Sequence, residues 1–192
     1  MIRVGMVLMS YPGPVSKGAA ATLAENVATA LARGWGVRID TPSVQPVDVA
    51  RNQAVRWARD AGCSHLLMQD ADTWVVPGSG PVGVLMREIG DAAAIAAVYQ
   101  LRGRGVASAA RLEADATYEC AMVGAGLMLI ALDHLPARGP WFKTETTADG
   151  CDVTCGEDGY FCRRIRAEGG TILATTKLQT RHDQVTALTL SM

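Results

Sequence analysis

The sequence lacks an excess of charge of either sign, and this lack narrows the partners that the protein could bind. Its 18 Lys and Arg residues nearly balance its 19 Asp and Glu residues, so the formal net charge is −1 over 192 residues. A polyanion such as nucleic acid would therefore need a local basic patch. Two arginine groups could supply one, although solvated surface is the more ordinary explanation of both: Arg102, Arg104 and Arg111, and Arg163, Arg164 and Arg166.

Long apolar runs are also missing. No run approaches the roughly 20 residues that a membrane-spanning helix needs. The segment Met1–Met9 is too short for a secretory signal and leads directly into a predicted strand. We therefore expect a cytoplasmic protein without a membrane span, which would have to be recruited if it acts at a membrane.

The cysteines lack a paired pattern. There are five of them, an odd number, and we interpret them as thiols of a reducing compartment. A zinc site formed by Cys151, Cys155 and Cys162 with the distant His182 is the alternative. Sites of that kind usually show paired C-x-x-C spacing, which is absent, so the pattern favours free thiols.

What is present is an alternation of apolar, β-prone runs with helical segments. Hydrophobic residues make up 49% of the chain and charged residues 19%, which is typical of a folded globular protein. The alternation predicts an α/β fold in one domain, 1–192, with an open, mixed, mostly parallel sheet flanked by helices. The expected strands are residues 2–9, 37–40, 66–68, 93–99, 127–131 and 171–175, the expected helices are 19–33, 47–61, 82–89 and one opening at 156, and residues 101–117 and 143–155 have no clear period.

Two carboxylates follow the apolar run Leu66–Met68. Asp70 and Asp72 stand at the carboxyl end of a strand that we expect to be buried on both faces, which is where ligands bind in open α/β sheets. In extended chain their side chains would point the same way, with Cα atoms roughly 6.5 Å apart. Without a basic neighbour they would repel each other, and Mg²⁺ or Mn²⁺ with a diphosphate would remove that repulsion. A solvated Asp-Ala-Asp turn is the alternative.

Two predicted helices carry charged residues near their first turns. Arg51 could face a phosphate there, or it could be a surface arginine. Glu157 and Asp158 could complement the helix dipole, or one of them could act as a general base over the cleft.

Three loop segments also allow two interpretations each. Tyr11 follows the first strand and could stack on a base or simply pack. Trp141 and Phe142 could form a platform for an apolar ring face or pack on their own domain. Gly124 and Gly126 lack the third glycine and the following helix of a dinucleotide fingerprint, so we reject a nicotinamide site. They indicate instead a close approach of the backbone to a ligand or a bend entering a strand.

Taken in order, these segments resemble the GT-A glycosyltransferases, and most closely the compact family 2-like proteins of bacteriophages and actinobacteria. The resemblance extends from Ile2 to about His182. The motifs that carry it are Val49–Asn52, Leu66–Asp72, Val123–Ile130, Pro140–Phe142, Gly156–Asp158 with Phe161–Arg164, and His182.

The resemblance implies a donor that is a nucleotide sugar, with UDP favoured, and Mn²⁺ or Mg²⁺ as cofactor. Asp70 and Asp72 match the DxD motif, in which Asp72 binds the metal and Asp70 reaches the ribose or the waters of the metal. His182 matches a late histidine that completes the metal shell. The other matches are Ser10, Tyr11 and Pro12 around the base, Arg51 in the nucleotide pocket, Gly124, Ala125 and Gly126 beneath the donor sugar, Glu157 and Asp158 as the xED motif with Asp158 the base of inverting members, and Trp141 and Phe142 near the acceptor.

The acceptor implied by the resemblance is a carbohydrate, a protein or, for a phage-encoded chain acting in the host cytoplasm, a hydroxymethylated base in DNA. Two other functions stay open. A nucleotidyltransferase usually has a Gly-rich loop with a lysine after the first strand, of which Lys17-Gly18 is the only trace. A non-catalytic binding module would have no need to keep Asp70, Asp72, Asp158 and His182 together.

Overall fold

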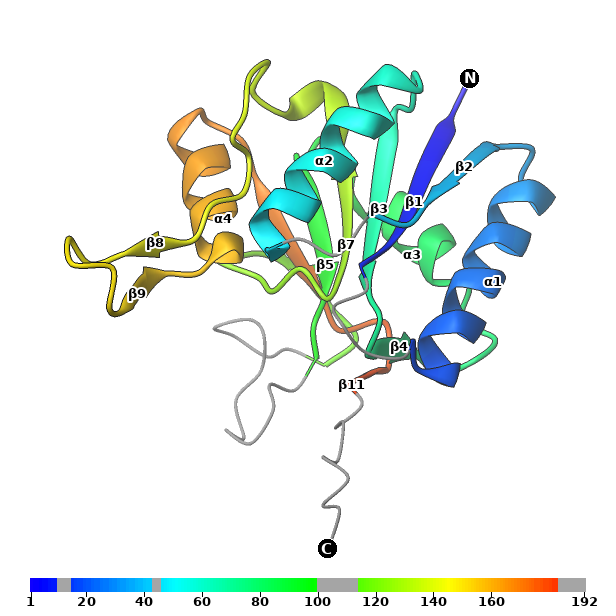
Figure 1. Ribbon diagram of the computed structural model, residues 1–192. Coiled ribbons are helices and arrows are strands. Elements are labelled where there is room, and N and C mark those ends of the chain that lie inside the picture. The colour runs from blue at the N-terminus through cyan, green and yellow to red at the C-terminus, as the bar shows by residue number, and fades with distance from the viewer. Residues whose placement is uncertain (10–14, 43–45, 100–113, 183–192) are drawn as a thin grey trace, which may run out of the picture.

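A computed structural model describes residues 1–9, 15–42, 46–99 and 114–182. Its centre is a seven-stranded sheet in the order β2-β1-β3-β7-β5-β10-β6 (Figure 1). Strand β1 pairs in parallel with β2 and β3, and β5 pairs in parallel with β10, whereas β7 and β6 pair antiparallel with their neighbours. The predicted α/β fold with a mixed, mostly parallel sheet is therefore confirmed. The strands are β1 (Arg3–Met9), β2 (Gly36–Asp40), β3 (His65–Asp70), β5 (Ala94–Ala97), β6 (Thr117–Glu119), β7 (Leu127–Ala131) and β10 (Ile172–Thr175).

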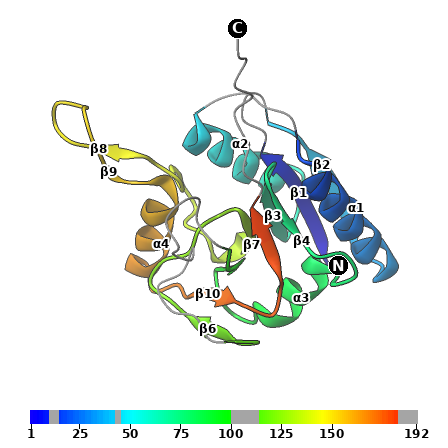
Figure 2. The same cartoon turned by 90° about the horizontal axis from the view of Figure 1, so that it is seen from below.

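Helices cover both faces of this sheet. Figure 2 shows α1 and α3 on one side of it and α2 and α4 on the other. None of the described helices is both long enough and apolar enough to cross a bilayer. The helices are α1 (Lys17–Ala32), α2 (Val47–Asp60), α3 (Pro81–Glu88) and α4 (Glu157–Ala167), with a short 3₁₀ turn, η1, at Leu132–His134.

The central strands divide the apolar core into two layers. Leu66 and Met68 of β3 pack with α2 and α4, while Leu67, which lies between them, packs with α1 and α3. Successive side chains of a strand point to opposite faces of a sheet. A continuous apolar run is thus what a strand covered on both faces requires, as the sequence predicted for this one.

Two short ribbons, like β6 in the main sheet, lie where no strand was expected from the sequence. β4 (Thr73–Val75) pairs antiparallel with β11 (Thr180–His182), and β8 (Glu145–Thr146) pairs antiparallel with β9 (Val153–Cys155). The β8–β9 hairpin stands away from the body beside α4 (Figure 1). The expectation that residues 143–155 have no regular structure is therefore wrong, because strands of two or three residues are too short to show a period.

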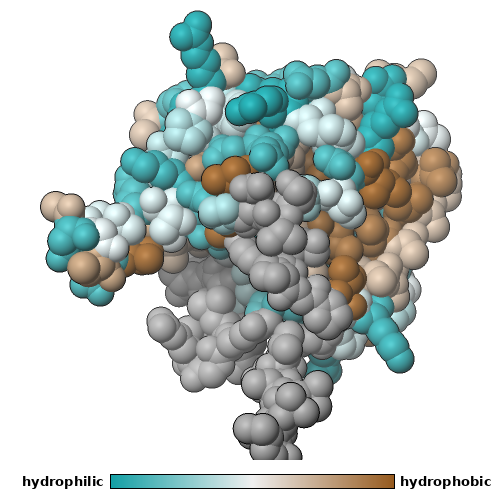
Figure 3. All heavy atoms as spheres, viewed as in Figure 1, coloured by the Kyte–Doolittle hydropathy of each residue, from teal (hydrophilic) through white to brown (hydrophobic). Residues whose placement is uncertain are grey.

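The edge of the sheet at β2 carries exposed apolar side chains. Leu31 at the end of α1 is 59% exposed and Ile39 of β2 is 52% exposed. Figure 3 shows apolar surface gathering on this side of the molecule. Leu31 is thus a natural reference for the energetic cost of removing a leucine from the core.

We predict that Leu67→Ala lowers the free energy of unfolding by about 2–5 kcal/mol, because Leu67 is 1% exposed and its loss leaves a cavity beside β3. Leu31→Ala removes the same atoms from an exposed position and should change it by no more than about 0.5 kcal/mol. Urea denaturation of the two variants measures both. Equal effects would mean that β3 is not buried on both faces.

Candidate active site

The candidate site lies at the carboxyl ends of β1 and β3. Asp70, the last residue of β3, is paired with Met9, the last residue of β1. The turn that follows is held by its backbone: Asp70 N–H donates to Gly126 O at 2.8 Å, Ala71 N–H donates to Met9 O at 3.0 Å, and Ser16 N–H donates to Ala71 O at 2.9 Å. The first strand, the start of α1 and the glycine segment therefore fix together where the two aspartates begin.

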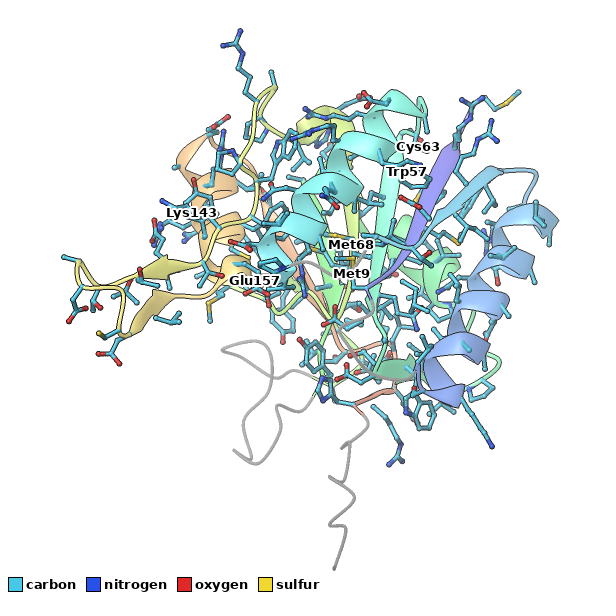
Figure 4. The ribbon with its side chains drawn as sticks, viewed as in Figure 1. Met9, Trp57, Cys63, Met68, Lys143 and Glu157 are labelled. Atoms are coloured by element: carbon cyan, nitrogen blue, oxygen red, sulfur yellow. The ribbon has the colours of Figure 1, made fainter. Side chains whose placement is uncertain are left out.

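Arg51 of α2 is the centre of a charged cluster. Its side chain is only 3% exposed. Its Nη1 lies 2.7 Å from Asp158 Oδ1, and its Nη2 lies 3.2 Å from Asp70 Oδ1 and 3.7 Å from Glu157 Oε1. Figure 4 shows Glu157 at the start of α4, on the side of the molecule where β1 ends at Met9. The structure thus brings together three of the predicted site carboxylates around one buried cation.

This arrangement corrects two expectations. Arg51 is not a surface arginine, because it is buried and carboxylates surround its guanidinium. Asp70 does have a basic neighbour, so a metal ion is not needed to relieve its charge. The assignment of Arg51 to a nucleotide pocket stays a prediction.

The cluster holds more negative than positive charge, and its ionisation reflects this. Burial raises the pKa of Asp70 to about 7, with Arg51 acting against that rise and Asp158 adding to it. Burial and the neighbouring Asp158 also raise the pKa of Glu157. Burial lowers the pKa of Arg51, but the three carboxylates more than offset this and leave it above its usual range. Arg51 is therefore always charged, whereas Asp70 changes its proton near neutral pH.

Asp72 belongs to a second group. Its Oδ1 lies 3.3 Å from His182 Nε2, and the ladder of β4 and β11 sets this contact by pairing His182 with Thr73. The expectation that Asp70 and Asp72 lie side by side on extended chain is wrong, because β3 ends at Asp70 and residues 71–72 form a turn. The two acids consequently have different partners.

The donor set around Asp72 fits part of a divalent metal site. Within the described ranges, no three His, Cys, Asp or Glu side chains are arranged so that they could hold a metal ion, so neither the set Asp70, Asp72 and His182 nor the zinc alternative is assembled. A carboxylate with an imidazole nevertheless suits Mn²⁺. Mg²⁺ and Mn²⁺ also take one or two carboxylates and fill their remaining positions with water and phosphate oxygens. Asp72 and His182 would therefore be the ligands that the protein supplies.

The glycine segment before β7 connects the two groups. Ala125 N–H donates to Asp158 Oδ2 at 3.1 Å. A Cβ atom on Gly126 would lie 2.8 Å from Tyr99 Cε1 and 2.9 Å from Thr73 Oγ1, and both distances are shorter than non-bonded contacts of a Cβ atom. Gly126 is thus required by the approach of side chains of the protein itself, and its placement beneath a donor sugar stays a prediction, as does that of Gly124.

Trp141 and Phe142 are part of the core. They are 6% and 1% exposed. Phe142 stacks on Phe161 of α4 with ring centroids 4.5 Å apart, and the Arg51 guanidinium lies 5.7 Å from the Phe142 ring. The packing alternative is therefore the one that the structure has, and neither ring offers a free face to a ligand.

Asn52 fixes the segment that carries these aromatic residues, and the sequence reasoning named it only as part of a motif. Its Nδ2 donates to Asp48 O and Phe142 O, both at 2.7 Å. Its Oδ1 accepts from the N–H groups of Trp141 at 2.8 Å and Phe142 at 3.2 Å. Tyr99 was missed altogether, because it ends an apolar run and has no sequence signal of a site.

Three predicted residues, Ser10, Tyr11 and Pro12, lie outside the described residues, and so does the arginine group Arg102, Arg104 and Arg111. Their assignments to the nucleotide base and to an acceptor stay predictions.

Comparison with known proteins supports the fold. Neither protein-family profiles nor curated sequences give a match. Three solved structures each have a TM-score of 0.59: A197 from STIV (17% identity, 95% of this chain and 86% of that chain), GalNAc-T7 with UDP, GalNAc and Mn²⁺ (14%, 94% and 44%), and S. aureus TarS 1–349 with UDP-GlcNAc (11%, 95% and 59%). The chain spans less than two thirds of the last two. At these identities the likeness establishes the fold alone, and that fold is the GT-A fold of glycosyltransferases.

We predict that Arg51→Met destabilises the protein by about 3–5 kcal/mol near pH 8, because it leaves buried carboxylates without their cation. The loss should shrink toward pH 5. With a raised pKa, Asp70 is protonated in the folded state and ionised in the unfolded state between pH about 4 and about 7, so its contribution to stability falls as the pH rises through this window. Arg51 opposes the rise in the pKa of Asp70. Removing Arg51 should therefore raise this pKa further and extend the pH range over which folding takes up a proton.

Denaturant unfolding at several pH values measures this. Arg87→Met is the matched control, since Arg87 is 60% exposed and pairs with Glu88 at the surface, and its effect should stay within about 1 kcal/mol. A loss for Arg51→Met that does not change with pH would contradict the assigned charge balance.

Proposed function

We propose that the protein transfers a sugar from a nucleoside diphosphate sugar, with UDP favoured, to an acceptor hydroxyl, and that residues 1–192 act as one domain. The GT-A fold supports this, as do two similar structures, GalNAc-T7 with UDP, GalNAc and Mn²⁺ and TarS with UDP-GlcNAc. The observation that carries the proposal is the cluster around Arg51. It joins Asp70 at the end of β3 to Asp158 at the start of α4, where the carboxyl ends of β1 and β3 lie.

In this proposal Asp72 and His182 form the donor half of the site. They would hold Mn²⁺ or Mg²⁺, whose chemistry is to neutralise the negative charge of a departing diphosphate. Their contact of 3.3 Å places a carboxylate oxygen of Asp72 next to an imidazole nitrogen of His182. Asp70 remains tied to Arg51, so its contribution to the donor half is to fix the start of the turn that carries Asp72.

Asp158 is the general base of the proposed reaction. It takes the proton of the acceptor hydroxyl while that oxygen forms a bond to the anomeric carbon and the bond from this carbon to the diphosphate breaks. Attack opposite the diphosphate inverts the anomeric centre. Arg51 holds Oδ1 of Asp158, and the Ala125 N–H holds Oδ2. Because each carboxylate oxygen has two lone pairs, both oxygens keep a position for the incoming proton.

The first experiment measures the binding of UDP, GDP and CDP by calorimetry with and without Mn²⁺. We predict that UDP binds best and that Mn²⁺ increases its affinity. Asp72→Ala should lose at least tenfold of the affinity measured with Mn²⁺, which is about 1.4 kcal/mol. Asp91→Ala, an exposed aspartate outside the site, is the control. If no nucleoside diphosphate binds to the folded protein in the presence of metal, the proposed function is wrong.

The second experiment tests the base. We predict that Asp158→Asn lowers the rate of sugar transfer by about 10²–10⁴-fold and changes the affinity for UDP less than threefold, since asparagine keeps an oxygen for Arg51. Glu157→Gln is the comparison, and should cost less. Transfer is assayed on carbohydrate acceptors and on hydroxymethylated against unmodified DNA. An Asp158→Asn variant as active as the parent would refute the assignment of the base.

A further inference from the structure

Tyr99 contacts the donor half of the proposed site through the imidazole of His182. It lies two residues beyond the end of β5 and is 7% exposed. The backbone around it is fixed: Val98 N–H donates to Thr175 O of β10 at 3.0 Å, and Val98 O accepts from the hydroxyl of Thr180 in β11. Tyr99 is therefore anchored between the main sheet and the ribbon that carries His182.

The ring of Tyr99 stacks on the imidazole of His182. Their centroids lie 5.4 Å apart and their planes are inclined by only 6°. The Nε2 atom of the same imidazole lies 3.3 Å from Asp72 Oδ1. The pairing of β11 with β4 determines where the backbone of His182 lies, but not the rotation of its side chain. A parallel ring against one face of the imidazole restricts that rotation.

Gly126 also limits where the Tyr99 ring can lie. A Cβ atom at this position would lie 2.8 Å from Cε1 and 2.9 Å from Cζ of the Tyr99 ring. Any larger residue would have to displace the ring. The absence of a side chain at Gly126 thus gives the ring its space, and the position of the ring in turn bears on His182.

The effects of the Tyr99 hydroxyl and of the Tyr99 ring can be tested separately. Burial raises the pKa of this phenol, and the carboxylates of Asp158 and Asp70 raise it further, so Tyr99 carries no charge at neutral pH. Tyr99→Phe consequently removes the hydroxyl without changing the charge of the site, and Tyr99→Leu removes the flat ring.

We propose that Tyr99 is a positioning residue for the metal half of the site: its ring, seated against Gly126, holds the imidazole of His182 toward Asp72. This inference rests on the proposed function, since it assumes that Asp72 and His182 bind a divalent cation with a nucleoside diphosphate. The inference adds Tyr99 to the site. It also makes metal binding depend on Gly126, which neither Asp72 nor His182 would imply.

The test compares the dissociation constant of UDP with and without Mn²⁺ in each variant, by calorimetry. The ratio of the two constants measures how well the site uses the metal, and a loss of folded protein alone does not change it. We expect Tyr99→Phe to keep the parent ratio within about twofold. Tyr99→Leu should reduce the gain from Mn²⁺ by about tenfold and leave metal-free binding of UDP unchanged. Tyr118→Leu makes the same replacement in β6, outside the site, and should keep the parent ratio.

Gly126→Ala provides an independent variant if Tyr99→Leu folds poorly. It leaves Tyr99 in place but displaces its ring, so it should reduce the gain from Mn²⁺ like Tyr99→Leu. Gly36→Ala, where the added atom meets Arg3 at an ordinary 3.4 Å, is its control.

The outcomes are distinct. If the parent binds UDP better with Mn²⁺ and both Tyr99→Leu and Gly126→Ala keep this gain, the inference is overturned while the proposed function stands. If Tyr99→Phe loses the gain as well, the hydroxyl and not the stacked ring is responsible, and the inference is again wrong. A parent protein without any gain from Mn²⁺ would instead remove the proposed metal site on which the inference rests.

Discussion

The burial of one guanidinium among three carboxylates is the constraint on which the rest of the site depends. Transferring charges out of water costs several kcal/mol for each ion, and only close pairing with good geometry offsets that cost. The terminal nitrogens of Arg51 meet this condition by contacting Asp70 and Asp158 at 3.2 and 2.7 Å, while the buried Nε has no hydrogen-bond partner among the described residues. The contacts tie α2 to the end of β3 and to the start of α4, so the cluster determines how these three elements meet.

The surrounding packing keeps this cation in place. Phe142 lies between Arg51 and the Phe161 ring of α4, and Asn52 binds the backbone of Phe142 on both its N–H and its C=O. Adjacent residues of α2 therefore supply the cation and the clamp for the ring beneath it. The buried aromatic segment therefore packs beneath the cation and against the helix that carries Glu157 and Asp158.

Six strands of the main sheet and its helices could be predicted from the sequence, because their apolar residues form continuous runs, as in β3 and β7, or recur with a regular spacing. The remaining strand, β6, has three residues and neither kind of pattern. The two ribbons could not be predicted either, since strands of two or three residues have no period, and one of them brings His182 to Asp72. Asp70, Arg51 and Asp158 were each named as site residues. Their pairing was not foreseen, because Arg51 and Asp158 are 107 residues apart and nothing in a sequence marks an arginine as buried.

Asp70 and Asp72 have different ionic partners, and this difference suggests a separate role for each acid of the Asp-x-Asp segment. Had both carboxylates faced one point, an external cation would have been needed to neutralise the pair whenever the protein folded. Because the chain turns after β3, the first acid pairs with Arg51 and the second with His182. Asp72 and His182 hold their oxygen and nitrogen donor atoms 3.3 Å apart, and it is this pair that we propose as the ligands of a cation. The Tyr99 ring, which stacks on His182, is the contact that we propose orients this imidazole toward Asp72.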